Sequence, residues 1–381
     1  MKKVIFISAL AIAAAVSCTK SDIVDTKFDE QISFENYIGR DAMTKATPYG
    51  SEALPESIGL YGYYLGTATT WTNTHKANLW ENENLSADAG YATTTKRYWA
   101  DDKDNYTFLA YAPATTTTNS LTDGSYKVTT GENGADPVIN YTVPTNLTNQ
   151  KDILYSNEHK LVQKSIVNTE TKKVPLVMKH ALSRITVKAK ATKEKANDVY
   201  AFDVKEVKLA GKFITEDNFN LYNGTWEKKG TKTSTDVNYL FDLNGTTDAN
   251  GKVTYTAYNE NHALGTSWTD YSKTTYKTDG TVDTYGNNYL MVIPTNLEAA
   301  DAVLTVVYTT TIGGLESTPY TKTFNVGREF AMGKAYSINL TFDKTTQAIE
   351  FSVSVEDWKE NTPAEGETPG DNHQKNENIV A

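Results

Sequence analysis

Cysteine is almost absent from this chain, because Cys18 is the only one among 381 residues. A single cysteine forms no internal disulfide and leaves no thiol catalyst elsewhere in the chain. Clusters of basic residues are also missing, and the formal net charge is −10. An acidic chain without basic patches argues against nucleic acid as a partner.

Catalytic and metal-binding motifs are missing too. No two of the five histidines have the spacing of metal ligands. The chain has no G-x-S-x-G elbow, no H-E-x-x-H and no phosphate-binding glycine loop. Carboxylate pairs such as Glu356-Asp357 would serve a glycosidase only at a set separation in a cleft. We therefore predict a protein that is not an enzyme, with no catalytic residue, no metal and no cofactor.

Long stretches with helical periodicity are absent, and short segments with alternating apolar and polar residues take their place. The clearest are residues 182–190, 335–342 and 349–355, and weaker ones are 58–65, 106–113, 138–143, 288–294 and 302–310. Asn-Gly and Asp-Gly pairs, which favour tight hairpins, recur at 123–124, 223–224, 244–245, 250–251 and 279–280. This pattern predicts an all-β protein built of sandwiches.

The N-terminus has the pattern of a secretory signal. Lys2 and Lys3 precede the apolar residues 4–16, a run too short to span a bilayer. Small residues lead into Cys18 in "AAVSC", which resembles a bacterial lipobox. We predict cleavage after residue 17 and acylation of Cys18, which would anchor the exported protein in the outer membrane. The alternative is plain signal cleavage, with Cys18 incidental.

An internal echo indicates two related domains. "VPTNL" at 143–147 returns as "IPTNL" at 293–297, and each copy ends one apolar strand and precedes another. We place the junction near residue 172, in a polar run. The predicted organisation is a signal peptide (1–17), a lipidated N-terminal segment (18–45), an N-terminal β-sandwich (46–172), a C-terminal β-sandwich (173–358) and a flexible tail (359–381).

Two alternating segments share one spacing of apolar residues, "ISFENYI" at 32–38 and "IEFSVSV" at 349–355. The shared positions are Ile32, Phe34 and Ile38 in the first segment, and Ile349, Phe351 and Val355 in the second. At the fourth residue after the isoleucine the first has Asn36, whereas the second has Val353. Burying valine gains roughly 1.5 kcal/mol or more, and burying an unpaired amide costs about 1–3 kcal/mol. Our hypothesis is that both segments fit one groove and that the second fits it better.

Several motifs, taken in their order along the chain, resemble those of the fimbrillins, which build type V pili on Gram-negative gut and oral bacteria. They are the lipobox followed by a strand, and then "TKA" (44–46), "YTFLAYAP", "KDILYS", "VPLVMKHALSRITVKAK", "GKAYSINLTF" and "FSVSVEDW". The resemblance covers nearly the whole mature chain. It implies two tandem transthyretin-like or Ig-like β-sandwich domains, a cell-surface location and assembly by protease-triggered donor-strand exchange.

The resemblance also implies roles for individual residues. An Arg- or Lys-specific protease would cut between Lys45 and Ala46 or, as second choice, between Arg40 and Asp41. Lysine at the first of these bonds departs from the arginine that is usual in the family. The leaving strand would carry Ile32, Phe34, Asn36 and Ile38, and the best donor candidate comprises Ile349, Phe351, Val353, Val355 and Trp358. Other fimbrillin subunits would be the partners, in a homo- or heteropolymer.

Other interpretations stay open from the sequence alone. The chain would then be a lipid-anchored adhesin or glycan-binding protein that never polymerises. In such a protein residues 31–38 would form a permanent strand, and residues 349–355 would form a fixed core strand. Such a protein would use surface tryptophans such as Trp71 or Trp80 on a host or bacterial receptor. A surface glycan hydrolase is a further alternative, although the chain shows no catalytic constellation.

Overall fold

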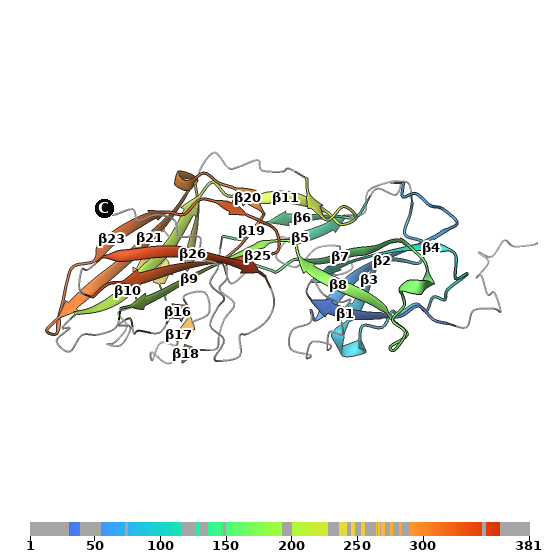
Figure 1. Ribbon diagram of the computed structural model, residues 1–381, viewed down its shortest axis with the longest axis horizontal. Coiled ribbons are helices and arrows are strands. Elements are labelled where there is room, and N and C mark those ends of the chain that lie inside the picture. Colours follow the sequence, from blue (N-terminus) through green and yellow to red (C-terminus); the bar gives the residue numbers. More distant parts are fainter. Residues whose placement is uncertain are drawn as a thin grey trace, which may run out of the picture.

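The computed structural model has two lobes, both built almost entirely of β-strands (Figure 1). The predicted all-β fold and its sandwich-like sheets are therefore confirmed. The structure describes residues 30–38, 55–72, 75–115, 126–129, 136–145, 147, 150–192, 200–227, 236–241, 245–247, 253–255, 264, 266, 268–270, 275–276, 282–283, 290–344 and 348–358. Over these ranges no helix combines the length and the apolar character that crossing a membrane requires.

The N-terminal lobe contains a six-stranded sheet in the order β1-β8-β7-β4-β2-β3. β1 runs parallel to β8, and the other neighbours are antiparallel. The strands are β1 (Phe34–Ile38), β2 (Ser57–Gly66), β3 (Trp80–Ser86), β4 (Asn105–Ala112), β7 (Leu154–Val162) and β8 (Val174–His180).

A four-stranded sheet in the order β12-β11-β6-β5 completes this sandwich. Alternation along β4 explains the packing, because Leu109 and Tyr111 belong to the core that includes this second sheet, whereas Phe108 belongs to a core on the other face. Tyr155 of β7 meets Phe219 of β11 with ring centroids 4.8 Å apart. The strands are β5 (Tyr126–Thr129), β6 (Val138–Thr142), β11 (Glu216–Asn220) and β12 (Thr225–Trp226).

The C-terminal lobe contains two five-stranded sheets. One has the order β13-β10-β21-β22, with β23 also paired to β21, and the other has the order β16-β9-β25-β26, with β19 also paired to β9. The strands are β9 (Ser183–Ala191), β10 (Tyr200–Gly211), β13 (Val237–Phe241), β16 (Thr269–Asp270), β19 (Leu290–Val292), β21 (Ala302–Ile312), β22 (Leu315–Glu316), β23 (Tyr320–Asn325), β25 (Lys334–Phe342) and β26 (Ile349–Asp357).

Short elements connect these sheets. Two-stranded pairs are formed by β14 (Gly245–Thr247) with β15 (Val253–Tyr255), β17 (Thr275–Tyr276) with β18 (Val282–Asp283), and β20 (Thr295–Asn296) with β24 (Glu329–Phe330). The 3-10 helices are η1 (Ala87–Ala89), η3 (Lys164–Ile166) and η4 (Ala299–Asp301).

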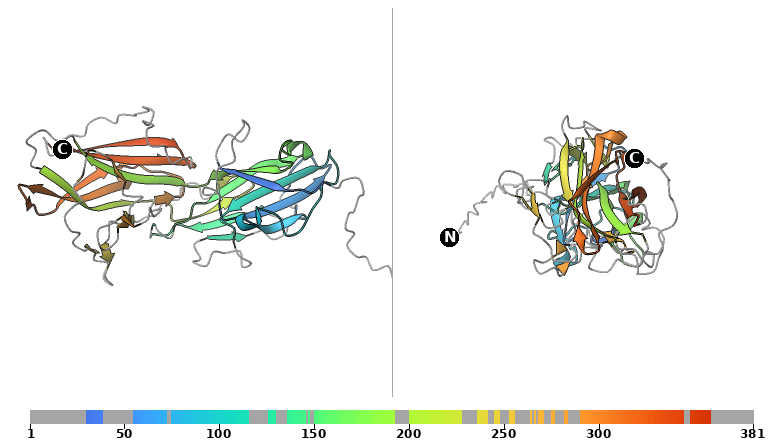
Figure 2. Two further views of the ribbon diagram at one scale, coloured as in Figure 1. Left: turned by 90° about the horizontal axis from the view of Figure 1, so that it is seen from below. Right: turned by 90° about the vertical axis from the view of Figure 1, so that its left-hand side faces the viewer.

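Two apolar cores hold the molecule together. The larger core runs without a break from the N-terminal sandwich into the C-terminal lobe. Figure 2 shows the two lobes end to end in its left view and looks along the long axis of the molecule in its right view. The smaller core lies on the other face of the six-stranded sheet and includes Ile32, Phe34, Trp80 and Phe108. Residues just before and within β1 are therefore part of a core and not a surface appendage.

The chain passes between the lobes more than once. β8 follows residue 172, near which we placed the domain junction, yet it lies in the N-terminal sheet between β1 and β7. β11 and β12 also return to this lobe, where Phe219 pairs with Ile139 of β6. A boundary at residue 172 would separate β8 from the strands with which it pairs.

Candidate functional site

Residues 30–38 lie in a slot with backbone partners on both sides, which we call the β1 slot. On one side the five residues of β1 pair in parallel register with β8. On the other side Ile32 N donates to Arg97 O at 2.8 Å, and Trp99 N donates to Glu30 O at 3.2 Å. The slot therefore lies between β8 and the segment around Arg97.

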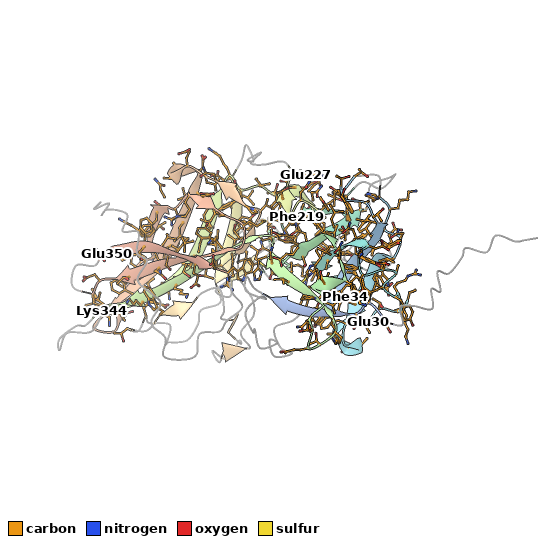
Figure 3. All side chains as sticks on the ribbon, turned by 45° about the vertical axis from the view of Figure 1, so that its right-hand side comes forward. Glu30, Phe34, Phe219, Glu227, Lys344 and Glu350 are labelled. Atoms are coloured by element: carbon orange, nitrogen blue, oxygen red, sulfur yellow. The ribbon has the colours of Figure 1, made fainter. Side chains whose placement is uncertain are left out.

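Apolar side chains anchor this segment in the smaller core. Ile32 is completely buried, and Phe34 is only 2% exposed. The ring of Phe34, labelled in Figure 3, meets Trp80 and Phe108 edge-on at centroid distances of 5.6 and 5.3 Å. Edge-to-face pairs of this kind contribute about 0.5–1.5 kcal/mol beyond their burial. The backbone of Ile38 pairs with Met178, while its side chain lies outside the described residues.

Asn36 breaks this apolar row. Its side chain is 6% exposed, and neither Nδ2 nor Oδ1 has a hydrogen-bond partner among the described residues. Its neighbour Glu35 does have one, because Asn168 Nδ2 donates to Glu35 Oε1 at 3.0 Å. A buried amide without partners costs about 1–3 kcal/mol. β1 is thus held by strong apolar contacts and weakened by one polar group.

On the side away from β1, β8 pairs with β7 over only a short stretch. β7 and β8 pair only at one end, through Leu154 with His180 and Tyr155 with Lys179. Along the rest of β8, the Nε2 of His159 donates to the carbonyl of Pro175. Burial lowers the pKa of His159 below its ordinary value, which favours the neutral ring. β1, or a strand in its place, therefore supplies the main ladder partner of β8.

β26 is the edge strand of its sheet and packs less tightly than residues 30–38. Over the described residues it pairs with β25 alone, from Ile349 opposite Phe342 to Asp357 opposite Lys334. Its apolar side chains are half-buried, except for Val355, which is 42% exposed. The ring of Phe351 lies 5.1 Å from that of Phe324, the main aromatic contact of the strand.

Trp358 fixes the end of β26 at the junction of the lobes. Its ring stacks on His180, with centroids 4.0 Å apart and planes within 4°. The guanidinium of Arg184 lies 5.1 Å from the centroid of the same ring, close enough for a cation–π contact. Nδ1 of His180 lies 2.8 Å from Asp152 Oδ2, and Trp358 N donates to Gly333 O at 2.9 Å. Trp358 is 7% exposed, whereas the side chains of β26 before it are half-buried or exposed.

The two tryptophans that the glycan-binding interpretation names, Trp71 and Trp80, contact neighbouring aromatic side chains. The ring of Trp71 stacks on that of Tyr222, with the centroids 4.4 Å apart, and the centroid of the His75 ring lies 5.4 Å from that of Trp71. Trp80 is buried beside Phe34 and donates to Thr95 O at 2.9 Å. Sugar binding through aromatic faces requires an exposed ring, whereas Trp80 is buried and Trp71 is half-buried with its ring stacked on Tyr222. No three His, Cys, Asp or Glu side chains gather as a metal site would require in the part of the chain that the structure describes.

Sequence reasoning selected the two strands but missed the walls of the β1 slot. The walls are β8, the segment around Arg97, Trp80 of β3 and Phe108 of β4. Their only sequence signal is an apolar residue in a strand-like pattern, which most strands of the chain share. Cys18, the bonds after Arg40 and Lys45, and residues 359–381 lie outside the described residues.

The model of one protein family, described as fimbrillin-like, matches residues 44–358. The chain belongs to the fimbrillin-like family. This membership gives the protein a structural or adhesive role in pili at the cell surface, with other fimbrillin subunits as partners and without enzymatic activity.

Three solved structures from Bacteroides species are similar to this chain. A fimbrial protein from Bacteroides vulgatus has a TM-score of 0.59 and 19% identity, over 86% of this chain and 99% of its own. Cell adhesion proteins from Bacteroides uniformis and Bacteroides ovatus have TM-scores of 0.43 each, with 18% and 15% identity. The alignments cover 87% and 86% of this chain and 100% and 97% of theirs. The first of these structures shares the fold of this chain. No curated protein matches the sequence of this chain.

Proposed function

We propose that this fimbrillin-like protein is the precursor of a pilus subunit that polymerises by strand exchange. Cys18 carries the lipid of the exported precursor in the outer membrane, and a protease cuts at Lys45 or Arg40. Residues 30–38 then leave the β1 slot, and β26 of another subunit enters it. The assembled fibre serves adhesion at the cell surface.

The observation that carries this proposal is the position of residues 30–38. They contribute to the smaller core, yet β1 is the last strand at one edge of its sheet. One cut in the chain after these residues therefore turns them into a separate peptide that is still bound to the fold. Two buried apolar side chains, Ile32 and Phe34, contribute about 1.5–3 kcal/mol each. Backbone hydrogen bonds add about 0.5–1.5 kcal/mol each. Such a peptide stays until a better strand competes for its place.

β26 has the properties of that competitor. Ile349, Phe351 and Val353 repeat the spacing of Ile32, Phe34 and Asn36 and replace the amide by an isopropyl group. In its own lobe β26 is half-buried at an edge, whereas the same positions of the β1 slot are almost fully buried. Transfer into the slot therefore gains apolar burial and removes an unpaired amide, so that exchange is downhill after the cut.

The direct test uses the purified precursor and a trypsin-like protease. We expect cleavage before residue 46, followed by release of residues 30–38 when a synthetic peptide of residues 349–358 is added in excess. Mass spectrometry of the separated small fragments measures the release. A 349–358 peptide with Val353→Asn is the matched control and should displace the strand more slowly. Retention of residues 30–38 after complete cleavage, with no peptide bound, would contradict the proposal.

A further inference from the structure

Three apolar side chains are exposed together at the far end of the C-terminal lobe. Leu315 is 80% exposed, Tyr320 49% and Ile312 45%. Ile312 and Leu315 face each other across the tight β21–β22 turn, which Gly313 and Gly314 close with positive φ angles. Single exposed apolar residues are ordinary, but a group of three on one hairpin requires an explanation.

The position of this group on its sheet explains its exposure. Alternation along β21 puts Ile312 on the same side as Leu304 and Val306, which are fully buried. Between them, the ring of Tyr308 lies 5.3 Å from Phe342, the last residue of β25, and 5.6 Å from Tyr320. Beyond Tyr308 the next residue on this side, Thr310, is still only 7% exposed, whereas Ile312 at the very end of β21 is 45% exposed.

The turn that leads into β26 lies at the same end of the molecule. Phe342 pairs with Ile349, and Asp343 N donates to Ala348 O at 2.8 Å, so β26 starts at the far end and runs back to the lobe junction. Figure 3 shows Lys344 and Glu350 at this end of the molecule and Glu30 towards the other. A β26 strand that swings out on this turn leaves the lobe next to the exposed group.

We propose that Ile312, Leu315 and Tyr320 form a docking surface for the N-terminal lobe of the second copy that receives β26. This inference rests on the proposed strand exchange and adds a contact to it. The donated strand brings the accepting lobe to the end of the molecule from which it emerges. That lobe then covers Ile312 at the end of β21 together with Leu315 and Tyr320, which are exposed in the donor.

The test combines a substitution with a crosslink. Leu315→Asp adds a charge to the docking surface, and Thr323→Asp adds the same charge to the outward face of β23, where Thr323 is exposed. Both side chains are exposed, so we expect both variants to unfold at the wild-type temperature. After protease treatment, Leu315→Asp should form SDS-resistant oligomers about tenfold more slowly or worse, since burial of one leucine accounts for such a factor. Thr323→Asp should keep the wild-type rate.

A photo-crosslinking amino acid gives a second readout in an otherwise native chain. At position 315 it should join two copies, with the adduct mapped to residues of the N-terminal lobe, and at position 323 it should not. Wild-type assembly by Leu315→Asp, or an absence of adducts between copies from position 315, would overturn the docking surface. The 349–358 peptide separates this failure from that of strand exchange: if it still enters the slot of the cleaved protein, only the docking inference fails.

Discussion

At the residue scale, Asn36 and Val353 occupy equivalent places in two otherwise similar strands. Asn36 lies in the buried row of its strand with no hydrogen-bond partner among the described residues, and this arrangement costs free energy without adding a contact. A pilus precursor needs a strand that completes the fold yet can be displaced. One polar side chain between apolar anchors meets both requirements.

Replacing this amide should strengthen the precursor and slow its exchange. We expect Asn36→Val to raise the free energy of unfolding by about 1–3 kcal/mol, because it removes an unpaired buried group and adds an apolar one. Denaturant unfolding of the uncut precursor measures the gain. After the cut, release of residues 30–38 should be slower than in wild type, and Glu35→Gln, which keeps an acceptor for Asn168, is the control. Equal release rates for Asn36→Val and wild type would count against the role of Asn36.

Phe34 should matter only until the strand leaves. Phe34→Ala removes a ring that contacts Trp80 and Phe108, so the precursor should lose about 3–5 kcal/mol of stability. Assembled subunits that have lost residues 30–38 should unfold at the same temperature as wild type. A difference between the two assembled forms would mean that the strand stays in place after processing.

His159 should make the contact between β7 and β8 sensitive to acid. Burial holds the pKa of this imidazole below its ordinary value of 6.5, so the folded chain binds its proton less readily than the unfolded chain does. The resulting stability is fully present above pH 6.5 and decreases as the pH falls below that value. We expect His159→Gln to flatten this part of the curve of unfolding free energy against pH. A wild-type curve with no decrease below pH 6.5 would be the contrary result.

At the scale of elements, residues 30–38 and β26 are both edge segments with opposite anchoring. In the first, Ile32, Phe34 and Asn36 are buried, whereas the apolar side chains of β26 are half-buried or exposed, and β26 is held by its ladder with β25 and by Trp358 at its end. Release of β26 therefore requires Trp358 to leave its stack on His180.

Loss of this stack should free the donor strand. We expect Trp358→Ala to raise hydrogen exchange in β26 more than in the strands of the N-terminal lobe. The cleaved variant should assemble faster if strand release limits the rate. Phe351→Ala, which removes an apolar side chain of the same strand, should instead assemble more slowly, because it weakens the strand in the slot as well. Unchanged exchange in β26 of Trp358→Ala would show that other contacts hold the strand.

Alternation in the sequence predicted many of the strands, and two of the strands that it missed have a clear physical cause. Each predicted segment contains a strand, and the Asn223-Gly224 pair closes the β11–β12 hairpin, with Gly224 at a φ of 71°. β10 was missed because a bulge between Val204 and Glu206 interrupts its alternation. β8 was missed as well, since Pro175 in its interior is unfavourable for a strand paired on both sides.

At the scale of the whole molecule, the pairing of distant strands could not be read from the sequence. β1 pairs in parallel with β8, and β9 with β25, although alternation gives each strand a face but no partner. The return of β11 and β12 to the N-terminal lobe is invisible for the same reason. The slot therefore follows from topology, whereas the apolar spacing of the segment that fills it could be read from the sequence.

The absence of internal disulfides also has a meaning at this scale. A fibre of such subunits would be held by inserted strands, and removal of a strand breaks its ladder and its apolar contacts together. The joint is then durable because its unfolding is slow. An exported protein with a single cysteine thus has a physical route to a stable polymer.

The most direct test is N-terminal sequencing and native sizing of the protein recovered from cell surfaces, with and without an inhibitor of trypsin-like proteases. Our account predicts a mature chain that starts at Ala46 or Asp41, in SDS-resistant ladders that disappear when the inhibitor is present. A chain that starts at acylated Cys18 and is found only as a monomer would contradict strand exchange.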